Sequence, residues 1–191
     1  MSRQRPLLRR ARATRGEIEI RNAREIYSNR FGTLYDDDVL FKDGVEGRYI
    51  RFLWHCRQTV AVLPVLEDGR YLLLQNFRHA VREWVLEIPK GFTGDDADAE
   101  TAARRELIEE TGLVAARIET LQTLYGDPGF IGTPTELFIA LGCTPAQAPE
   151  PEAEETIGEL IALSPTEART AIADGRVRDA LTTVAILRGP D

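Results

Sequence analysis

The stretch GFTGDDADAETAARRELIEETGL, residues 91–113, decides the fold of this chain. Its second half is typical of an amphipathic helix, because small and apolar residues recur on one face. These residues are Ala99, Ala102, Ala103, Leu107 and Ile108. Asp95, Asp96 and Asp98 favour a helix N-terminus just after them, and Gly112 suits a left-handed cap at the other end.

The C-terminal half of this helix carries an arrangement that folding alone does not favour. Glu106, Glu109 and Glu110 stand at positions i, i+3 and i+4, so three carboxylates share one surface. Each like-charge pair costs roughly 0.2–0.5 kcal/mol in an isolated helix, and the helix dipole disfavours anions at this end. A solvated acidic face, moderated by Arg104 and Arg105, is one explanation. A bound divalent cation is the other, because clustered carboxylates are ligands for Mg²⁺ or Mn²⁺.

The wider spacing favours the cation. From Gly91 to Leu113 the chain resembles the Nudix box, Gly-x5-Glu-x7-Arg-Glu-U-x-Glu-Glu-x-Gly-U, in which U is aliphatic. Every fixed position matches except the first Glu, which is replaced by Ala97. In the family that Glu has a supporting role, whereas the metal ligands come from the segment that corresponds to residues 105–110.

The resemblance implies a metal site and its residues. Glu106, Glu109 and Glu110 are expected to bind Mg²⁺ or Mn²⁺, together with the main-chain carbonyl of Lys90. Arg105 and Glu109 are expected to be catalytic residues. Family members that hydrolyse ADP-ribose commonly have Ala where this chain has Lys90, so the exact substrate stays open.

The composition indicates one domain with an N-terminal extension. The chain has 191 residues, 43% of them hydrophobic, and no apolar run of membrane-spanning length. Residues 1–16 form a basic arm with six Arg and no acid, so the rest of the chain, with 18 basic and 31 acidic residues, carries −13. Such a body disfavours broad binding of nucleic acid. We expect the arm to be a flexible or partner-bound tail, with an RNA contact or an organellar presequence as alternatives.

Two cysteines, Cys56 and Cys143, provide neither a disulfide framework nor metal-ligand spacing. This usage is typical of a reducing compartment and predicts a cytoplasmic protein in which both thiols are packing residues.

Residues 17–57 read as an N-terminal strand region with an Asp43-Gly44 turn. The expected strands are Glu17–Ile20, Val39–Phe41 and Tyr49–Leu53. The region resembles the N-terminal strands with which ADP-ribose pyrophosphatases dimerise, so a homodimer is expected. Trp54 is either a core or interface residue or a platform for a base.

Residues 59–66 and 71–77 are predicted to form a hairpin covered on both faces. The segment from Gln75 to Arg78 resembles the Gln-x-Phe-Arg motif of ADP-ribose and nucleotide-sugar pyrophosphatases. That resemblance implies that Arg78 grips a substrate phosphate, for which a guanidinium fork is suited. A surface ion pair is the alternative. Glu87 resembles a family acid that lies near the metals.

After the box, a strand over Arg117–Tyr125 is followed by the turn Asp127-Pro128-Gly129 and a strand from Thr135. The turn and Glu136 resemble the Tyr-x-Ser-Pro-Gly…Glu-x-x-x-Phe-x-Ala pattern of ADP-ribose pyrophosphatases, with Asp127 in place of Ser. The resemblance implies that Pro128 and Glu136 contact the substrate.

The Pro- and Glu-rich loop of residues 145–156 is either a solvated linker or, as in the family, the carrier of the general base. Glu155 ranks first because it directly precedes the strand expected at Ile157–Leu163; Glu154 ranks second, Glu152 third, and Glu136 is a rival. A helix is then expected after the capping box that begins at Ser164, and a final helix over Arg178–Arg188.

Together these patterns predict an α/β fold, a Nudix α/β/α sandwich with a mixed sheet over residues 58–191 and an N-terminal β-strand extension. The implied reaction is metal-dependent hydrolysis of the pyrophosphate bond in a nucleoside diphosphate linked to another moiety, such as ADP-ribose or a related sugar nucleotide. The alternatives are another Nudix substrate (GDP-mannose, a flavin or dinucleotide polyphosphate, an oxidised nucleotide) and a non-catalytic nucleotide-sugar sensor.

Overall fold

The computed structural model describes residues 18–94, 98–151 and 156–191, which fall into two compact units. Of these residues, the first unit comprises 18–55 and Asp127–Thr133, and the second comprises those that lie within Cys56–Gly126 and Pro134–Asp191. The first unit thus includes Asp127–Thr133, a segment that follows the box. The sequence predicts this segment to lie in the Nudix domain of residues 58–191 and not in the N-terminal strand region.

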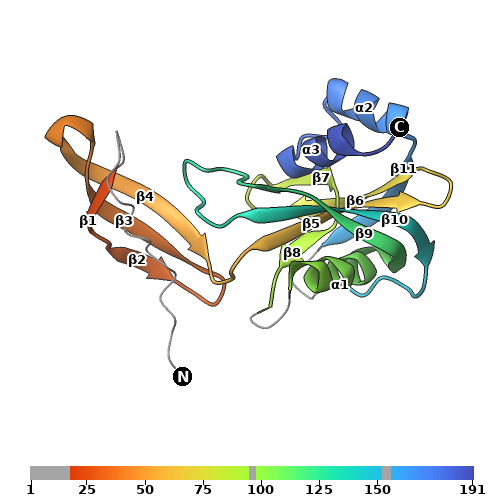
Figure 1. Ribbon diagram of the computed structural model, residues 1–191, viewed down its shortest axis with the longest axis horizontal. Helices are drawn as coiled ribbons and strands as arrows, with labels where there is room; N and C mark the ends of the chain where they lie inside the picture. The colour runs from red at the N-terminus through yellow and green to blue at the C-terminus, as the bar shows by residue number, and fades with distance from the viewer. Residues whose placement is uncertain (1–17, 95–97, 152–155) are drawn as a thin grey trace. The chain divides into compact units, whose positions relative to one another are not determined.

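The first unit is built on a four-stranded antiparallel sheet with β3 at its centre (Figure 1). Its strands are β1 (Glu19–Asn22), β2 (Glu25–Ser28), β3 (Gly32–Leu40) and β4 (Glu46–Trp54). β3 and β4 are joined by the short 3-10 helix η1 (Lys42–Gly44), in which Gly44 takes φ of 81°. The predicted turn and three of these strands are confirmed, whereas β2 was not predicted.

The second unit is built on a seven-stranded mixed sheet with the order β11-β6-β5-β10-β9; β7 pairs with β6, and β8 pairs with β5. The strands are β5 (Thr59–Leu66), β6 (Tyr71–Arg78), β7 (Glu83–Glu87), β8 (Lys90–Phe92), β9 (Leu113–Leu124), β10 (Thr135–Pro145) and β11 (Ile157–Leu163). β5 and β10 are parallel, and the other described pairs are antiparallel. One side of β5 meets β6 at Val65 and β8 at Thr59–Ala61, so the box begins on a strand beside the centre of the sheet.

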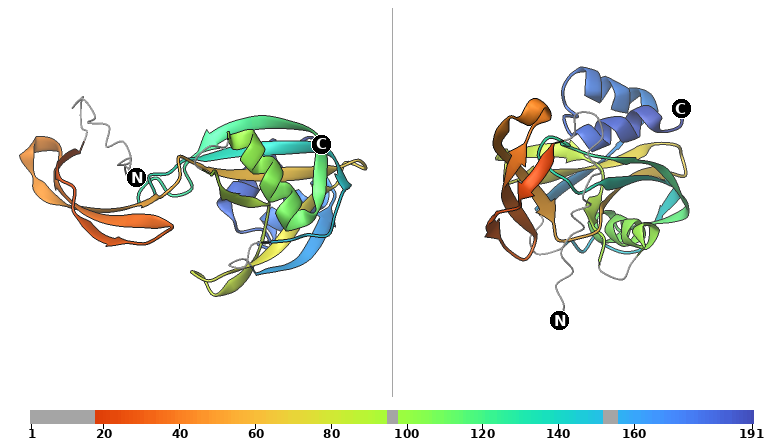
Figure 2. Two further views of the ribbon diagram at one scale, coloured as in Figure 1. Left: turned by 90° about the horizontal axis from the view of Figure 1, so that it is seen from below. Right: turned by 60° about the vertical axis from the view of Figure 1, so that its left-hand side comes forward.

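Three helices cover this sheet: α1 (Ala99–Thr111) lies on one face, and α2 (Pro165–Ala173) and α3 (Ala180–Arg188) lie on the other (Figures 1 and 2). The predicted α/β/α sandwich is therefore confirmed. Among the helices of the described residues, none has the length and apolar character needed to span a membrane.

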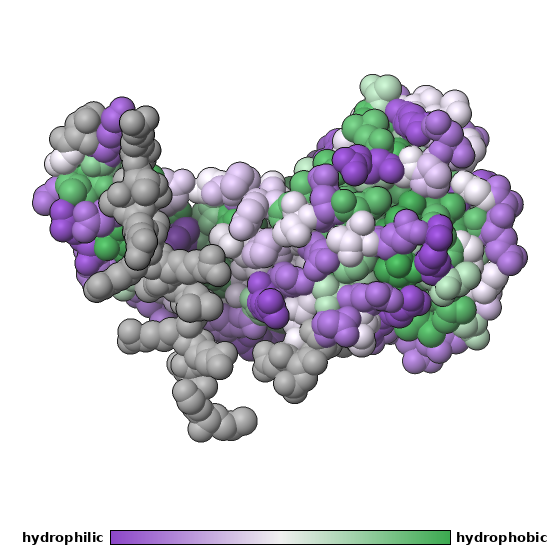
Figure 3. All heavy atoms as spheres, in the orientation of Figure 1, coloured by the Kyte–Doolittle hydropathy of each residue, from purple (hydrophilic) through white to green (hydrophobic). Residues whose placement is uncertain are grey.

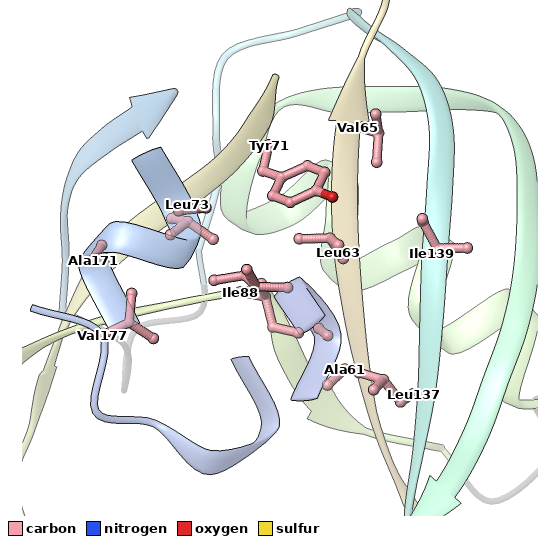
Figure 4. Packing of buried hydrophobic residues seen from close by; sticks show 13 residues of the cluster. Ala61, Leu63, Val65, Tyr71, Leu73, Ile88, Leu137, Ile139, Ala171 and Val177 are labelled. Carbon is pink, nitrogen blue, oxygen red and sulfur yellow. The ribbon is translucent and has the colours of Figure 1, made fainter. Parts of the chain in front are cut away.

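The central strand β5 is buried on both faces, as its near-continuous apolar sequence predicts. Because successive side chains of a strand point to opposite faces, Val60 and Val62 pack with α1, whereas Ala61, Leu63 and Val65 pack with residues of α2 and α3. Figure 4 shows the cluster that contains Ala61, Leu63 and Val65, which lies between the strands and the C-terminal helices.

The helix ends follow the predicted signals. The side chain of Asp98 caps α1 by accepting a hydrogen bond from Thr101 N (2.8 Å), and Gly112 ends the helix with φ of 71°. Ser164 and Glu167 form the predicted capping box of α2. The final helix, expected from Arg178, begins at Ala180 because the side chain of Asp179 caps it.

Candidate active site

Two of the box carboxylates lie buried where α1 faces β8. Glu106 is 4% exposed and Glu110 is 1% exposed. Oε2 of Glu110 accepts a hydrogen bond from the main-chain N of Lys90 at 3.3 Å. A Cβ on Gly91 would overlap the carboxylate of Glu106, so only glycine allows this close approach. The carboxylates of Glu106 and Glu110 therefore lie against the main chain of residues 90–91 in β8.

Glu109, the third box carboxylate, forms an ion pair with Arg105. Nη1 of Arg105 lies 2.5 Å from Oε2 of Glu109, and Nη2 lies 2.5 Å from Oε1 of Glu106. Nη2 also donates to the carbonyl of Phe92 at 2.9 Å. Burial opposes the charge of Arg105, but Glu106 and Glu109 outweigh it and raise the pKa of the guanidinium above its usual range. Arg105 thus offsets part of the repulsion expected on this helix face.

These residues fit a divalent cation in their chemistry. Buried carboxylates beside a main-chain segment are the oxygen donors that Mg²⁺ and Mn²⁺ prefer. Within residues 18–94, 98–151 and 156–191, however, no three His, Cys, Asp or Glu side chains are grouped closely enough to hold an ion. Glu109 and Glu106 both pair with Arg105 instead.

A second group of charges lies beside the box and is centred on Glu87, the buried last residue of β7. Arg78, the last residue of β6, donates from Nε to Oε2 of Glu87 at 3.2 Å and from Nη2 to Oε1. The ammonium of Lys90 lies 3.0 Å from Oε2 of Glu87 and 2.7 Å from Oδ1 of Asp179. The buried carboxylate of Glu87 therefore pairs with both Arg78 and Lys90, and Lys90 also pairs with Asp179, the N-cap of α3.

The charge of Arg78 is stabilised by its neighbours. Burial opposes the charged form, but the Glu87 pair outweighs it and raises the pKa of the guanidinium, with smaller contributions from Glu110 and Asp179. Glu87 takes the Nε/Nη2 edge, and the side chain remains 39% exposed. A guanidinium has a second fork, Nη1/Nη2, so Arg78 can keep its pair with Glu87 and bind another anion.

Glu136 is the second residue of β10, and its partners differ from those of the Glu87 group. Its Oε2 accepts from Nε2 of Gln58 at 2.7 Å, and its Oε1 accepts from Oγ1 of Thr120 at 3.4 Å. The carbonyl of Gln58 in turn accepts from Oγ1 of Thr93 at 2.7 Å, just after β8. Glu136 is thus held in one orientation by side chains of the second unit.

Pro128 belongs to the first unit, and the two units are described separately. It lies in the predicted tight turn, in which the main-chain N of Gly129 donates to Oδ1 of Asp127 at 3.2 Å.

Glu155, Glu154 and Glu152 lie outside the described residues, as does Ala97. The described start of their loop is bound to the end of α1. Main-chain N of Glu150 donates to the carbonyl of Glu109 at 2.8 Å. Main-chain N of Ala146 and of Gln147 donate to the carbonyl of Gly112 at 2.9 and 3.2 Å. The loop with the predicted base therefore starts beside the box helix.

Residues 56–182 match the model of the NUDIX domain family. The chain belongs to the Nudix family. It is 28% identical over 162 residues to the ADP-ribose pyrophosphatase of Bacillus subtilis (strain 168), covering 85% of this chain and 86% of that protein. It is 31% identical over 160 residues to the GDP-mannose pyrophosphatase of Cronobacter sakazakii (strain ATCC BAA-894), covering 78% and 82%.

Among solved structures, the Nudix chain is similar to a crystal structure of an ADP compounds hydrolase, with a TM-score of 0.77, 21% identity, and 90% and 91% of the two chains covered. The predicted Nudix fold is confirmed by this likeness. The predicted family and enzyme class, a Nudix pyrophosphohydrolase of the ADP-ribose and nucleotide-sugar type, are confirmed by the family match and the relatives.

Sequence reasoning missed Asp179 and Gln58, two residues that hold predicted members of the Nudix site. Asp179 gave a detectable signal, because an Asp directly before an apolar helix is a typical N-cap. That signal predicts the cap and carries no information about Lys90.

Proposed function

We propose that the chain hydrolyses the pyrophosphate bond of a nucleoside diphosphate linked to another moiety, with ADP-ribose or a related sugar nucleotide as substrate and Mg²⁺ or Mn²⁺ as cofactor. The observation that carries the proposal is the burial of Glu106 and Glu110 against residues 90–91 in a Nudix chain. Folding alone does not favour two buried acids there, whereas a metal-binding function explains them.

Glu106, Glu110 and Glu109 would bind the cation, with the carbonyl of Lys90 as a further oxygen donor. Glu106 and Glu109 each contact Arg105, so these contacts would have to be exchanged if both carboxylates bound the metal. Arg105 then remains beside the site as a cation close to the reacting phosphates. A divalent cation held by these residues would supply positive charge for the developing phosphate charge and would lower the pKa of the attacking water.

Arg78 would bind a phosphate of the substrate through its Nη1/Nη2 edge while Glu87 keeps the other edge. An arginine oriented by a buried carboxylate loses little side-chain freedom when the anion arrives, and the fork matches two phosphate oxygens. Glu136 and Pro128 are proposed as further substrate contacts.

The general base is proposed to be Glu155, with Glu154 as the alternative. The hydrogen bonds of Glu150 and Gln147 to the end of α1 support this proposal, because they bring the start of the loop to the helix that carries Glu109 and Glu110. A base must come within hydrogen-bond reach of its water, directly or through a second water.

GDP-mannose, which carries a different base from ADP-ribose, is the second candidate substrate. The similarity to a GDP-mannose pyrophosphatase favours it, and Lys90, at a position where ADP-ribose hydrolysing members commonly have Ala, leaves the exact substrate open.

The chain is proposed to act as a homodimer in the cytoplasm. The first unit exposes several large hydrophobic side chains on its four-stranded sheet, and Figure 3 shows hydrophobic residues at its surface. They include Ile20, Ile26, Tyr27 and Ile50. Exposed apolar residues on a small sheet are suited to a second copy of the chain. The free thiols of Cys56 and Cys143 fit the reducing compartment.

The test is phosphate release, with a phosphatase as coupling enzyme, over ADP-ribose, GDP-mannose, dinucleotide polyphosphates and oxidised nucleotides, with and without Mg²⁺. We expect Mg²⁺-dependent turnover of ADP-ribose or a sugar nucleotide. Glu110→Gln should lower turnover roughly 10²–10³-fold, the scale of losing a major electrostatic group. Glu119→Gln, an exposed acid on β9 paired with Arg117, is the control and should turn over normally.

Two outcomes would contradict the proposal. Wild-type turnover in both Glu106→Gln and Glu110→Gln would remove the metal assignment. Nucleotide binding without turnover of any tested substrate would identify a sensor.

A further inference from the structure

Lys90 is bound to both helical layers of the second unit. Its main-chain N donates to Glu110 on α1, and its ammonium reaches Asp179 at the start of α3 at 2.7 Å. The next residue, Gly91, faces the carboxylate of Glu106. The position of residues 90–91 therefore depends on α3 as well as on the box helix.

Asp179 uses both carboxylate oxygens in this connection. Oδ1 receives the ammonium of Lys90, and Oδ2 accepts from the main-chain N and the hydroxyl of Thr182 at 2.9 and 2.7 Å. The same hydroxyl accepts from the main-chain N of Ile88 at 3.0 Å. Two hydrogen-bonded routes thus join the N-terminus of α3 to the segment between β7 and the box: Asp179 binds Lys90 directly, and it orients the Thr182 hydroxyl that binds Ile88.

The connection is charged and largely buried. The side chains of Lys90 and Asp179 are 17% and 18% exposed, and Thr182 and Ile88 are fully buried. Burial opposes ionisation of Asp179, but the Lys90 ammonium and the hydrogen bonds of Thr182 outweigh it and lower the pKa of Asp179. An ion pair in such surroundings has a defined geometry, because few other partners are available to either charge.

The remaining partner of Lys90 is Glu87, which also holds Arg78. If Asp179 lost its charge, the ammonium would be held by Glu87 alone, and the hydrogen bond from Ile88 N to Thr182 would remain as the link between this segment and α3. The change would reach Glu110 through the hydrogen bond from the main-chain N of Lys90.

We propose that Asp179 is a positioning residue of the metal site: by binding Lys90 it fixes residues 90–91 against Glu106 and Glu110. The inference rests on the proposed function, because it assumes that these carboxylates bind the cation. Groups that orient metal ligands without touching the metal typically change metal affinity about 10–100-fold when they are mutated.

Asp179→Asn separates this role from helix capping. Asn is as good an N-cap as Asp, so its oxygen can still accept from the main-chain N of Thr182 and α3 should remain intact. Its NH₂ group is a donor and cannot pair with the Lys90 ammonium. Asp174→Asn is the matched control, because it removes an equal charge from an exposed pair with Arg176 near the end of α2.

The experiment measures Mn²⁺ binding to the full chain by the electron paramagnetic resonance signal of free Mn²⁺. We expect affinity to fall about 10–100-fold in Asp179→Asn and in Lys90→Met, with a nearly unchanged melting temperature in Asp179→Asn. The double variant should be no weaker than Lys90→Met, because Lys90→Met already removes the pair with Asp179 as well as the pair with Glu87. Asp174→Asn should bind like the wild type.

Hydrogen exchange in the metal-free protein gives an independent readout. The amide of Lys90 should exchange faster in Asp179→Asn, and amides in the middle of α3 should not. Wild-type Mn²⁺ affinity and exchange in Asp179→Asn, or fully additive losses in the double variant, would overturn the inference. A wild-type chain that binds no Mn²⁺ would instead refute the proposed function, and the exchange rates would still show whether Asp179 holds Lys90.

Discussion

Each unit of the molecule contains a buried carboxylate held by an arginine through the same two nitrogens. In the first unit, Nε and Nη2 of Arg51 donate to the two oxygens of Asp37 at 2.5 and 3.3 Å. In the second unit, the same nitrogens of Arg78 donate to the two oxygens of Glu87. Both carboxylates are 1% exposed.

The two arginines differ in what surrounds them. The guanidinium of Arg51 lies over the ring of Tyr35, 4.2 Å from its centre, and the side chain is 16% exposed. The side chain of Arg78 is 39% exposed, and its carboxylate has a second cation, Lys90, at 3.0 Å. We call the first pair closed, because Arg51 is largely buried under Tyr35. We call the second pair open, because one edge of the Arg78 guanidinium remains available. In the open pair, the charge of Glu87 is also balanced by Lys90.

The closed pair should show the largest effect on stability. Arg51→Met removes the cation that holds Asp37, and breaking a buried pair by removing one partner typically costs about 3–5 kcal/mol. Urea unfolding monitored by circular dichroism measures the change. Arg21→Met, which breaks an exposed pair with Glu19, is the control and should stay within about 0.5 kcal/mol of wild type. A similar small loss in Arg51→Met would mean that Asp37 finds another partner.

The open pair should show the reverse pattern. Arg78→Met leaves Glu87 with Lys90, so its loss of stability should be smaller than that of Arg51→Met. Binding of ADP in the presence of Mg²⁺, measured by calorimetry, should weaken because charge-assisted hydrogen bonds of about 1.5–3 kcal/mol are lost, roughly 10–100-fold in Kd. Normal binding with a large loss of stability would make Arg78 as structural as Arg51.

Arg78→Lys sharpens the same distinction. The ammonium restores the charge beside Glu87, so stability should return to nearly the wild-type value. It cannot form a planar fork toward two oxygens, so ADP binding should remain roughly tenfold weaker than in wild type. Full recovery of binding would show that charge alone, and not the fork, recognises the phosphate.

The smallest effect concerns the aromatic ring that closes the first pair. Tyr35→Leu should cost about 0.5–2 kcal/mol, the range of a cation–π contact from exposed to desolvated sites. A double-mutant cycle with Arg51→Met isolates this contribution, because Tyr35→Leu should cost less once the guanidinium is gone. Equal losses in both backgrounds would mean that the ring only covers the sheet.

The parts of the fold that follow from local signals were predictable from the sequence. The box helix has an Asp at one end and a Gly in the left-handed conformation at the other, and both act within a few residues. The strand Ile157–Leu163 has the expected bounds because capping by Ser164 fixes where it ends. β2 was missed because its four residues, Glu25–Ser28, are all exposed and show no apolar alternation.

The partners of the charged side chains were less predictable. Strand register places Arg78 opposite Glu83, yet Arg78 pairs with Glu87, and Glu83 pairs with Arg178. Pairing in a sheet gives neighbours along the backbone, whereas long side chains choose among all acids within reach. The contact of Lys90 with Asp179 spans 89 residues, and no local pattern encodes it.

The double burial of β5 has a consequence for the order in which the molecule can form during synthesis. Thr59 on β5 pairs with Thr135 on its parallel partner, 76 residues later in the chain. The helices that cover Ala61 and Leu63 come still later, at the C-terminus. A nascent chain can therefore cover one edge of β5 with β6 and β8 and one face with α1, but the other edge and face stay open until β10, α2 and α3 are made. Such a partly covered apolar strand makes a truncated chain prone to aggregation.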